Sequence, residues 1–83
     1  MPVPVAETKA EMRRISERFR EFRRKNLYSQ EELARLMGVT GRTVRNVEIG
    51  AYGVSAVVLR KFNEVRQVVA DNKAAGRMVR IPR

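Results

Sequence analysis

The stretch that decides the fold runs from Ser29 to Glu48 and reads SQEELARLMGVTGRTVRNVE. Ser29 precedes Glu32 by three residues, which is the spacing of a capping box at the start of a helix. Gly38 is placed to end that helix, because glycine adopts the left-handed backbone conformation without strain. Thr40 can cap a second helix. The stretch therefore predicts two short helices joined by a tight turn.

The second of these helices has one apolar and one polar face. Val44 and Val47 are spaced to pack inward, whereas Arg42, Arg45 and Asn46 face away from them. A single helix fits the major groove of DNA. There, arginine donates two hydrogen bonds to guanine, and asparagine pairs both ways with adenine. The polar face is therefore typical of a helix that reads bases.

Longer helices are expected on both sides of this pair. Met12, Ile15, Phe19 and Phe22 recur at spacings of three and four, which predicts a helix from about residue 7. Apolar positions recur in the same way over about residues 55–75, with no glycine or proline before Gly76. We expect an all-α fold, a compact bundle of four to five helices. Its parts are a flexible arm (1–6), one domain (7–75, with the helix pair at about 29–48) and a basic C-terminal tail (76–83).

Composition narrows the function. The chain has 83 residues, which is one domain, with 18 Lys and Arg against 9 Asp and Glu and a net charge of +9. Such a surface attracts nucleic acid. Histidine and cysteine are both absent, which excludes thiol nucleophiles, imidazole bases and metal sites built from thiolate or imidazole ligands. We expect no enzyme, no cofactor and no metal. No apolar run is long enough to span a membrane and no signal peptide is recognisable, so a soluble intracellular protein is expected.

The sequence contains, in this order, Phe19, Arg23, SQEELA, MGVT, TV, VE and Gly50. This order of residues resembles the Cro/cI phage-repressor type of helix-turn-helix domain. This type is also called the xenobiotic-response-element type. The resemblance spans roughly residues 19–65 and implies a lambda-repressor-like fold. It also implies that Gln30 binds a backbone phosphate of DNA and that Arg23 forms an internal ion pair with Glu48. The positions that match base-facing ones are Gly41, Arg42, Arg45 and Asn46, and those placed for phosphate or a thymine methyl are Thr40 and Thr43.

The resemblance implies a sequence-specific regulator of transcription that binds double-stranded DNA, Cro-like or repressor-like and of phage or prophage origin. It would act in the bacterial cytoplasm or nucleoid, or in the host cell if a phage encodes it. Helix 40–48 would enter the major groove, and a homodimer would bind a palindromic operator. Arg77 and Arg80 are further candidates for phosphate contacts. Candidate dimer contacts, which alternatively pack against the first helix, are Val65, Val68, Val69, Met78, Val79 and Ile81.

Three alternatives stay open. The first is an antitoxin or other partner-bound regulator, in which Ile49, Tyr52 and the tail hold a protein. The second is a protein that recognises a DNA packaging or recombination site. The third is a non-specific binder of nucleic acid or anionic surfaces, driven by charge alone.

The sequence also departs from the family pattern, since Gly41 offers no side chain to a base and Val54 stands where proline is common.

Overall fold

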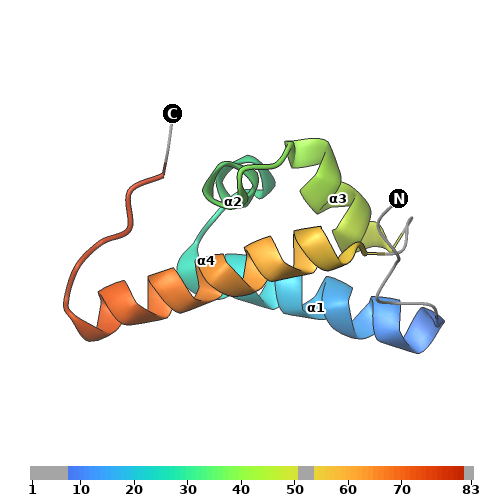
Figure 1. The fold of residues 1–83 in the computed structure, drawn as a ribbon, viewed down its shortest axis with the longest axis horizontal. Coiled ribbons are helices and arrows are strands. Elements are labelled where there is room, and N and C mark those ends of the chain that lie inside the picture. Colours follow the sequence, from blue (N-terminus) through green and yellow to red (C-terminus); the bar gives the residue numbers. More distant parts are fainter. Residues whose placement is uncertain (1–7, 51–53, 82–83) are drawn as a thin grey trace.

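The computed structural model describes residues 8–50 and 54–81, and within them every regular element is a helix (Figure 1). The predicted arm at residues 1–6 and the partner contact at Tyr52 lie outside the described residues. The all-α prediction is confirmed, with four helices in this part of the chain: α1 (Lys9–Asn26), α2 (Gln30–Met37), α3 (Gly41–Ile49) and α4 (Ala56–Ala74).

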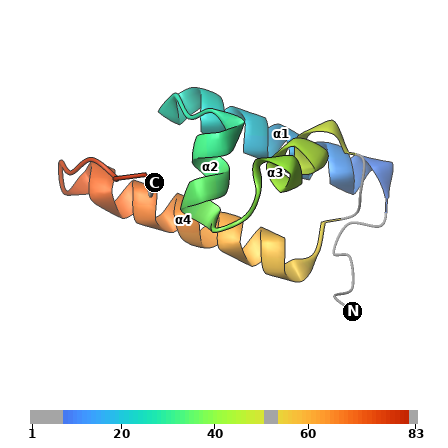
Figure 2. The ribbon, with the colours of Figure 1, turned by 90° about the horizontal axis from the view of Figure 1, so that it is seen from above.

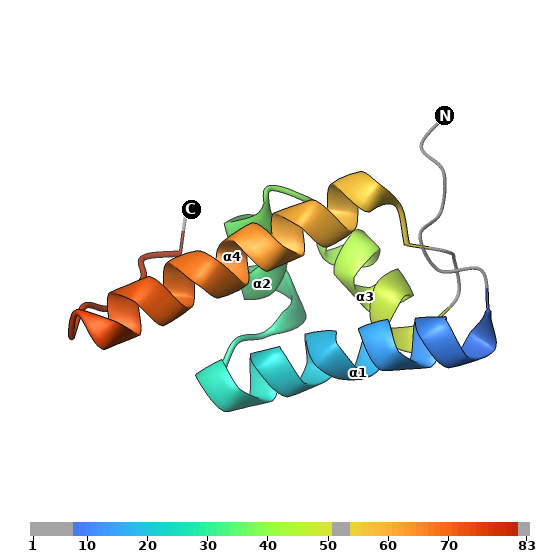
Figure 3. The ribbon, with the colours of Figure 1, turned by 60° about the horizontal axis from the view of Figure 1, so that its bottom comes forward.

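The two long helices, α1 and α4, run in the same direction, and α2 and α3 lie over one side of them (Figures 1, 2 and 3). Aromatic rings join the long helices: Phe19 stacks on Phe62 with ring centroids 3.9 Å apart, and Phe22 meets the edge of the same ring at 5.6 Å. Such pairs add attraction beyond the burial of apolar area. The rings therefore fix α1 against α4 beneath the shorter helix pair.

Local signals set the helix starts. The hydroxyls of Thr8, Ser29, Thr40 and Ser55 each accept a hydrogen bond from a backbone N–H in the first turn of the helix that follows. The capping box predicted at Ser29 is present, with the Glu32 carboxylate accepting from the Ser29 N–H at 2.9 Å. α2 and α3 both end on glycine in the left-handed conformation, as predicted for α2 at Gly38.

The core lies where the four helices meet. It includes Val54, which is 2% exposed and takes the place where proline is common. The other buried apolar residues are Ile15, Phe19, Leu33, Ala34, Met37, Val44, Val47, Phe62, Val65 and Val69. Val65 and Val69, which periodicity alone left open as dimer contacts, thus belong to the core of the single chain. No helix in residues 8–50 and 54–81 is long and apolar enough to cross a membrane.

After α4 the chain has no regular structure as far as Ile81. The turn is closed by the Arg77 N–H, which donates to the Asn72 carbonyl at 2.7 Å. The tail then bends back toward α2 (Figure 1), and Val79 packs against the core. The C-terminal segment is therefore partly folded onto the domain.

Leu27 ends α1 in a conformation that leucine rarely adopts. Its φ is 59°, and among the described residues it is the one non-glycine residue with positive φ. Its side chain is 88% exposed, so packing does not offset the strain. A left-handed backbone costs non-glycine residues roughly 1–2 kcal/mol. The α1–α2 turn is therefore a strained point of the fold.

We expect Leu27→Gly to raise the free energy of unfolding by about 1 kcal/mol, since the strain removed exceeds the added backbone entropy of the unfolded chain. For a domain of this size the melting temperature should rise by about 4–8 °C, measured by circular dichroism. Leu27→Ala is the control, because it removes the exposed side chain but keeps Cβ and the strain. A glycine variant no more stable than the alanine variant would contradict this interpretation.

Candidate nucleic-acid interface

The outer face of α3 carries the side chains predicted to read bases. Arg42 and Arg45 are exposed and Asn46 is half-buried, whereas Val44 and Val47 on the opposite side lie in the core. The structure thus places the three polar side chains on one face of a helix whose other face is packed. No carboxylate of the described residues forms an ion pair with either arginine, so both guanidinium groups can donate to an external acceptor.

Two threonines shape the start of α3. The Thr40 hydroxyl accepts from the Thr43 N–H at 3.2 Å, and the two side-chain oxygens are hydrogen-bonded at 3.0 Å. Thr40 is exposed and Thr43 is half-buried. The Thr40 hydroxyl therefore caps the helix, and both hydroxyls lie at the end from which Arg42 projects. A hydroxyl can donate and accept, so this pair keeps the capacity to meet a phosphate oxygen.

A buried carboxylate joins three helices at the other end of α3. Glu48 is 3% exposed, and its two oxygens accept from Arg23 Nε at 2.6 Å and Nη2 at 2.7 Å. The hydrogen bond to Glu48 and the negative charge of that carboxylate raise the pKa of the Arg23 guanidinium above its ordinary value. Partial burial of the guanidinium lowers this pKa but does not outweigh the effect of Glu48. This is the pair that the resemblance implied, in the two-pronged geometry that makes such contacts strong.

Gln30, the predicted phosphate ligand, begins α2 beside the same carboxylate. Its Nε2 donates to Glu48 Oε1 at 3.4 Å, which is a long hydrogen bond, and its side chain is half-buried. The bond orients the amide without using all of its donors and acceptors. Because the first turn of a helix also presents free backbone N–H groups, Gln30 lies where an anion is favoured.

Two further residues of α1 hold the C-terminal end of α3, and the sequence did not reveal them. The Ser16 hydroxyl donates to the Val47 carbonyl at 2.5 Å, and Arg20 Nη1 donates to the Glu48 carbonyl at 2.7 Å. The last carbonyls of a helix have no partner within it. Arg20 supplies a donor to the Glu48 carbonyl, and Ser16 adds a second donor to the Val47 carbonyl, which also accepts from the Gly50 N–H. One signal was available: Ser16 is a small polar residue beside the apolar stripe that contains Ile15 and Phe19.

Gly41 is the predicted base-facing position that differs most from expectation. It is buried even though it begins α3, because the Glu31 side chain of α2 covers it. A Cβ atom on residue 41 would overlap Glu31 Oε1 and lie 2.9 Å from Oε2. Residue 41 therefore presents no surface of its own, and a carboxylate takes the place of its side chain.

The residues predicted for phosphate and dimer contacts at the C-terminus differ in exposure. Arg77 and Arg80 are exposed, and Arg77 Nε also donates to Asn72 Oδ1 at 3.1 Å. Val68 is 51% exposed and Met78 is 93% exposed. The remaining dimer candidates outside the core, Val79 and Ile81, are half-buried.

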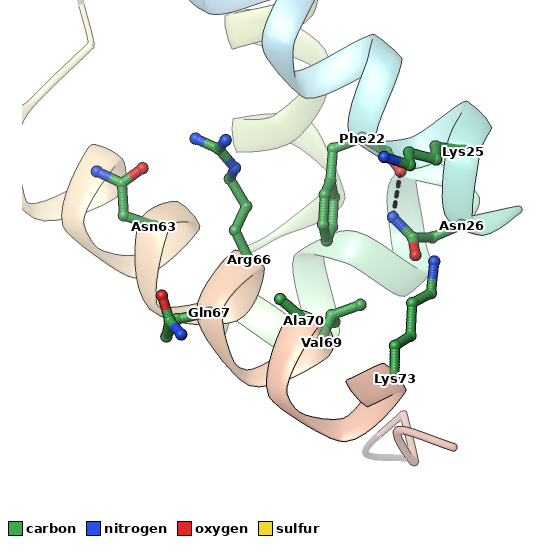
Figure 4. A pocket seen from close by; sticks show the side chains of 9 residues that line it. All are labelled: Phe22, Lys25, Asn26, Asn63, Arg66, Gln67, Val69, Ala70 and Lys73. Atoms are coloured by element: carbon green, nitrogen blue, oxygen red, sulfur yellow. Dashed lines mark hydrogen bonds between the residues drawn. The ribbon is translucent and has the colours of Figure 1, made fainter. Parts of the chain in front are cut away.

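A separate groove of about 500 Å³ lies between the C-terminal half of α1 and α4 (Figure 4). None of its nine described lining residues carries a carboxylate, and three carry positive charge: Lys25, Arg66 and Lys73. The Asn26 amide beside them donates to the Phe22 carbonyl at 2.9 Å, while its Oδ1 is buried without a partner. The groove contains none of the predicted base-reading residues, so it is distinct from the face of α3.

Comparison with known proteins agrees with the geometry. The profile of the helix-turn-helix family matches residues 19–65, which include α2, α3 and the aromatic contact between α1 and α4. Searches of curated proteins and of solved structures returned no match to the chain.

The Arg23–Glu48 pair is expected to be a main contributor to stability. Arg23→Ala leaves a buried carboxylate without its partner and should lower the free energy of unfolding by about 3–5 kcal/mol, toward the lower end because Arg23 is 23% exposed. The measurement is urea denaturation followed by circular dichroism. The matched control is Arg24→Ala, its exposed neighbour, for which little change is expected.

The double variant Arg23→Ala with Glu48→Gln separates charge from packing. A neutral amide is less costly to bury than an unpaired carboxylate, so the double variant should regain part of the lost stability. Equal stability of Arg23→Ala and Arg24→Ala would show that the pair contributes little.

Proposed function

Because the chain belongs to the Cro/C1-type helix-turn-helix family, a family of DNA-binding regulators, we propose that it is a sequence-specific repressor-like regulator of transcription. The observation that carries this proposal is the outer face of α3. Arg42, Arg45 and Asn46 project from one side of a helix that is packed on its other side. Their chemistry matches guanine and adenine edges in the major groove.

The way in which α3 is held supports base reading rather than attraction by charge alone. Discrimination between bases requires side chains fixed to within about 0.5 Å of their productive positions. Thr40 caps one end of α3, and α1 binds the other end through Ser16, Arg20 and Arg23. A binder driven only by net charge would need no such control over one helix. The non-specific alternative therefore explains less of this structure.

Phosphate contacts would set the register of α3 on the duplex. We propose that Gln30, at the first turn of α2, takes a backbone phosphate, with help from the partial positive charge of the helix end. Thr40 and Thr43 would do the same at the start of α3. The exposed Arg77 and Arg80 would add charge contacts that do not depend on sequence.

We propose that the protein acts as a homodimer on a palindromic operator, since one short helix makes few base contacts. Two copies would place their α3 helices in half-sites about 34 Å apart. A pocket of about 200 Å³ between α2, α4 and the tail supports an apolar contact in this region, because Val68 and Val79 line it beside Leu36 and Met37. The proposed dimer surface is formed by Val68, Met78, Val79 and Ile81.

Ile49 favours one second function. It is 66% exposed at the end of α3. An exposed apolar side chain next to the reading helix suits a protein partner, so a partner-bound regulator such as an antitoxin is the alternative proposal. Either function rests on binding rather than catalysis and takes place where the DNA is, in the bacterial cytoplasm or nucleoid, or in the host cell of a phage.

Selection of bound duplexes from a random pool should give a palindromic motif. On that motif, Arg42→Ala or Asn46→Ala should lose about 1–3 kcal/mol of binding free energy and relax specificity at one position. Arg77→Ala or Arg80→Ala should instead weaken binding to all duplexes alike and reduce the salt dependence. Fluorescence anisotropy over a range of salt concentrations measures both effects. Equal losses from the two groups on random and selected duplexes would argue against base reading.

The proposed dimer surface predicts that Val68→Glu or Met78→Glu shifts the protein from dimer to monomer, because a buried unpaired carboxylate is costly at an interface. Sedimentation velocity gives the association state, and circular dichroism checks that the helices persist. Val57→Glu is the matched control, since Val57 is 41% exposed on α4 but lies outside the pocket lining. If all three variants keep the wild-type association state, the surface lies elsewhere.

A further inference from the structure

The space beside Gly41, the first residue of α3, is occupied by the side chain of Glu31 from α2. Gly41 has only hydrogen at Cα, and the carboxylate of Glu31 occupies the space where a Cβ atom would stand. Glu31 belongs to the first turn of α2, next to the proposed phosphate ligand Gln30. One carboxylate oxygen lies 1.9 Å from the Cβ position, too close for both atoms to be present, and the other lies 2.9 Å from it. A carboxylate contributed by another helix therefore covers the buried Gly41 at the start of α3, next in sequence to the exposed Arg42.

Two features explain why the carboxylate lies there. The first N–H groups of α3 lack acceptors within the helix, and their partial positive charge favours an acidic group nearby. Any larger residue at position 41 would exclude Glu31 from this place. Among the described residues Glu31 forms no ion pair, and it is exposed. Its oxygens therefore keep acceptor capacity for a group outside the chain.

We propose that Glu31 is a base-reading residue, which accepts a hydrogen bond from the amino group of cytosine through the gap left by Gly41. This inference rests on the proposed function, since it requires that the outer face of α3 enters the major groove. It adds to that function a residue from outside the reading helix and the base that this residue selects.

The choice of cytosine follows from the acceptor-only chemistry of a carboxylate. In the major groove only cytosine N4 and adenine N6 donate hydrogen bonds. Guanine presents O6 and N7 and thymine presents O4, all of them acceptors that repel a carboxylate. Adenine N7, next to its amino group, repels the second carboxylate oxygen as well. Cytosine alone has a donor and no acceptor on its own major-groove edge, so it is the favoured base.

The same carboxylate would be unfavourable for simple attraction by charge. The Glu31 carboxylate repels the phosphate backbone, so a protein that bound DNA only through its positive charge would bind more tightly without it. Arg42 follows Gly41 directly and offers a cation suited to guanine. The start of α3 thus combines a donor group for guanine with an acceptor group for cytosine. Such a pair discriminates against wrong sequences as well as favouring the right one.

The test is selection of bound duplexes by wild type, Glu31→Ala, Glu31→Gln and Gly41→Ala, followed by affinities for duplexes changed at the cytosine position. Wild type should prefer cytosine there by about tenfold, and Glu31→Ala should lose that preference. Glu31→Gln should shift it toward adenine, because an amide can donate to N7 while accepting from N6. Preferences at the positions assigned to Arg42 and Asn46 should persist.

Gly41→Ala distinguishes reading from a merely structural role. The added Cβ displaces the flexible end of Glu31, while alanine is a better helix former than glycine. This variant should therefore keep or raise its melting temperature and yet lose the cytosine preference. Asp71→Asn is the charge control, because it removes one exposed acidic charge near the far end of α4 and keeps an oxygen for its Gln67 contact.

The outcomes separate this inference from the proposed function. If wild type selects no motif, both are overturned. If wild type selects a motif that Glu31→Ala and Gly41→Ala leave unchanged, only the role of Glu31 is overturned. The role of Glu31 is also overturned if Glu31→Ala binds every duplex more tightly by one common factor. That result would mean that the carboxylate only repels phosphate, as the loss of any acidic charge near the DNA would show.

Discussion

The Glu48 carboxylate is the constraint on which the arrangement of the three N-terminal helices depends. A buried carboxylate is tolerated only with a close partner, and Arg23 of α1 supplies two hydrogen bonds to it. Gln30 of α2 approaches one of the same oxygens. Because Glu48 lies near the end of α3, satisfying its charge fixes the position of α3 against both other helices. The packing of Val44 and Val47 then excludes water from the inner face of α3.

A helix as short as α3, with nine residues, is marginal on its own in water. Its shape in this protein comes from its two ends. Thr40 and Gly50 define where it starts and stops, and the bonds from Ser16 and Arg20 satisfy carbonyls at its C-terminal end. α1 is therefore more than a layer of the core. It is the support that keeps the polar face of α3 rigid, and this rigidity is what base discrimination requires.

The sequence predicted what is encoded locally. The Ser29 capping box, the stop at Gly38 and the apolar stripe of α1 depend on neighbours within a few residues. Of the contacts across the fold, the resemblance implied the Arg23–Glu48 pair, but others were missed. Ser16 and Arg20 bond to a helix about thirty positions away, and the relation of Glu31 to Gly41 exists only once α2 and α3 have packed. Periodicity also cannot separate core from interface, which is why Val65 and Val69 stood beside Val68 as dimer candidates.

The effect of the chain's strong positive charge on DNA binding depends on where its acidic groups lie. Positive charge alone gives affinity for any duplex, and salt weakens it uniformly. Glu48 is neutralised inside the protein by Arg23, so it contributes to structure and not to the surface field. Glu31 is exposed beside the start of α3, where a negative charge lowers the sequence-independent affinity for DNA. An acidic group retained at that position is consistent with specificity, because a group that weakens most complexes and strengthens one widens the difference between them.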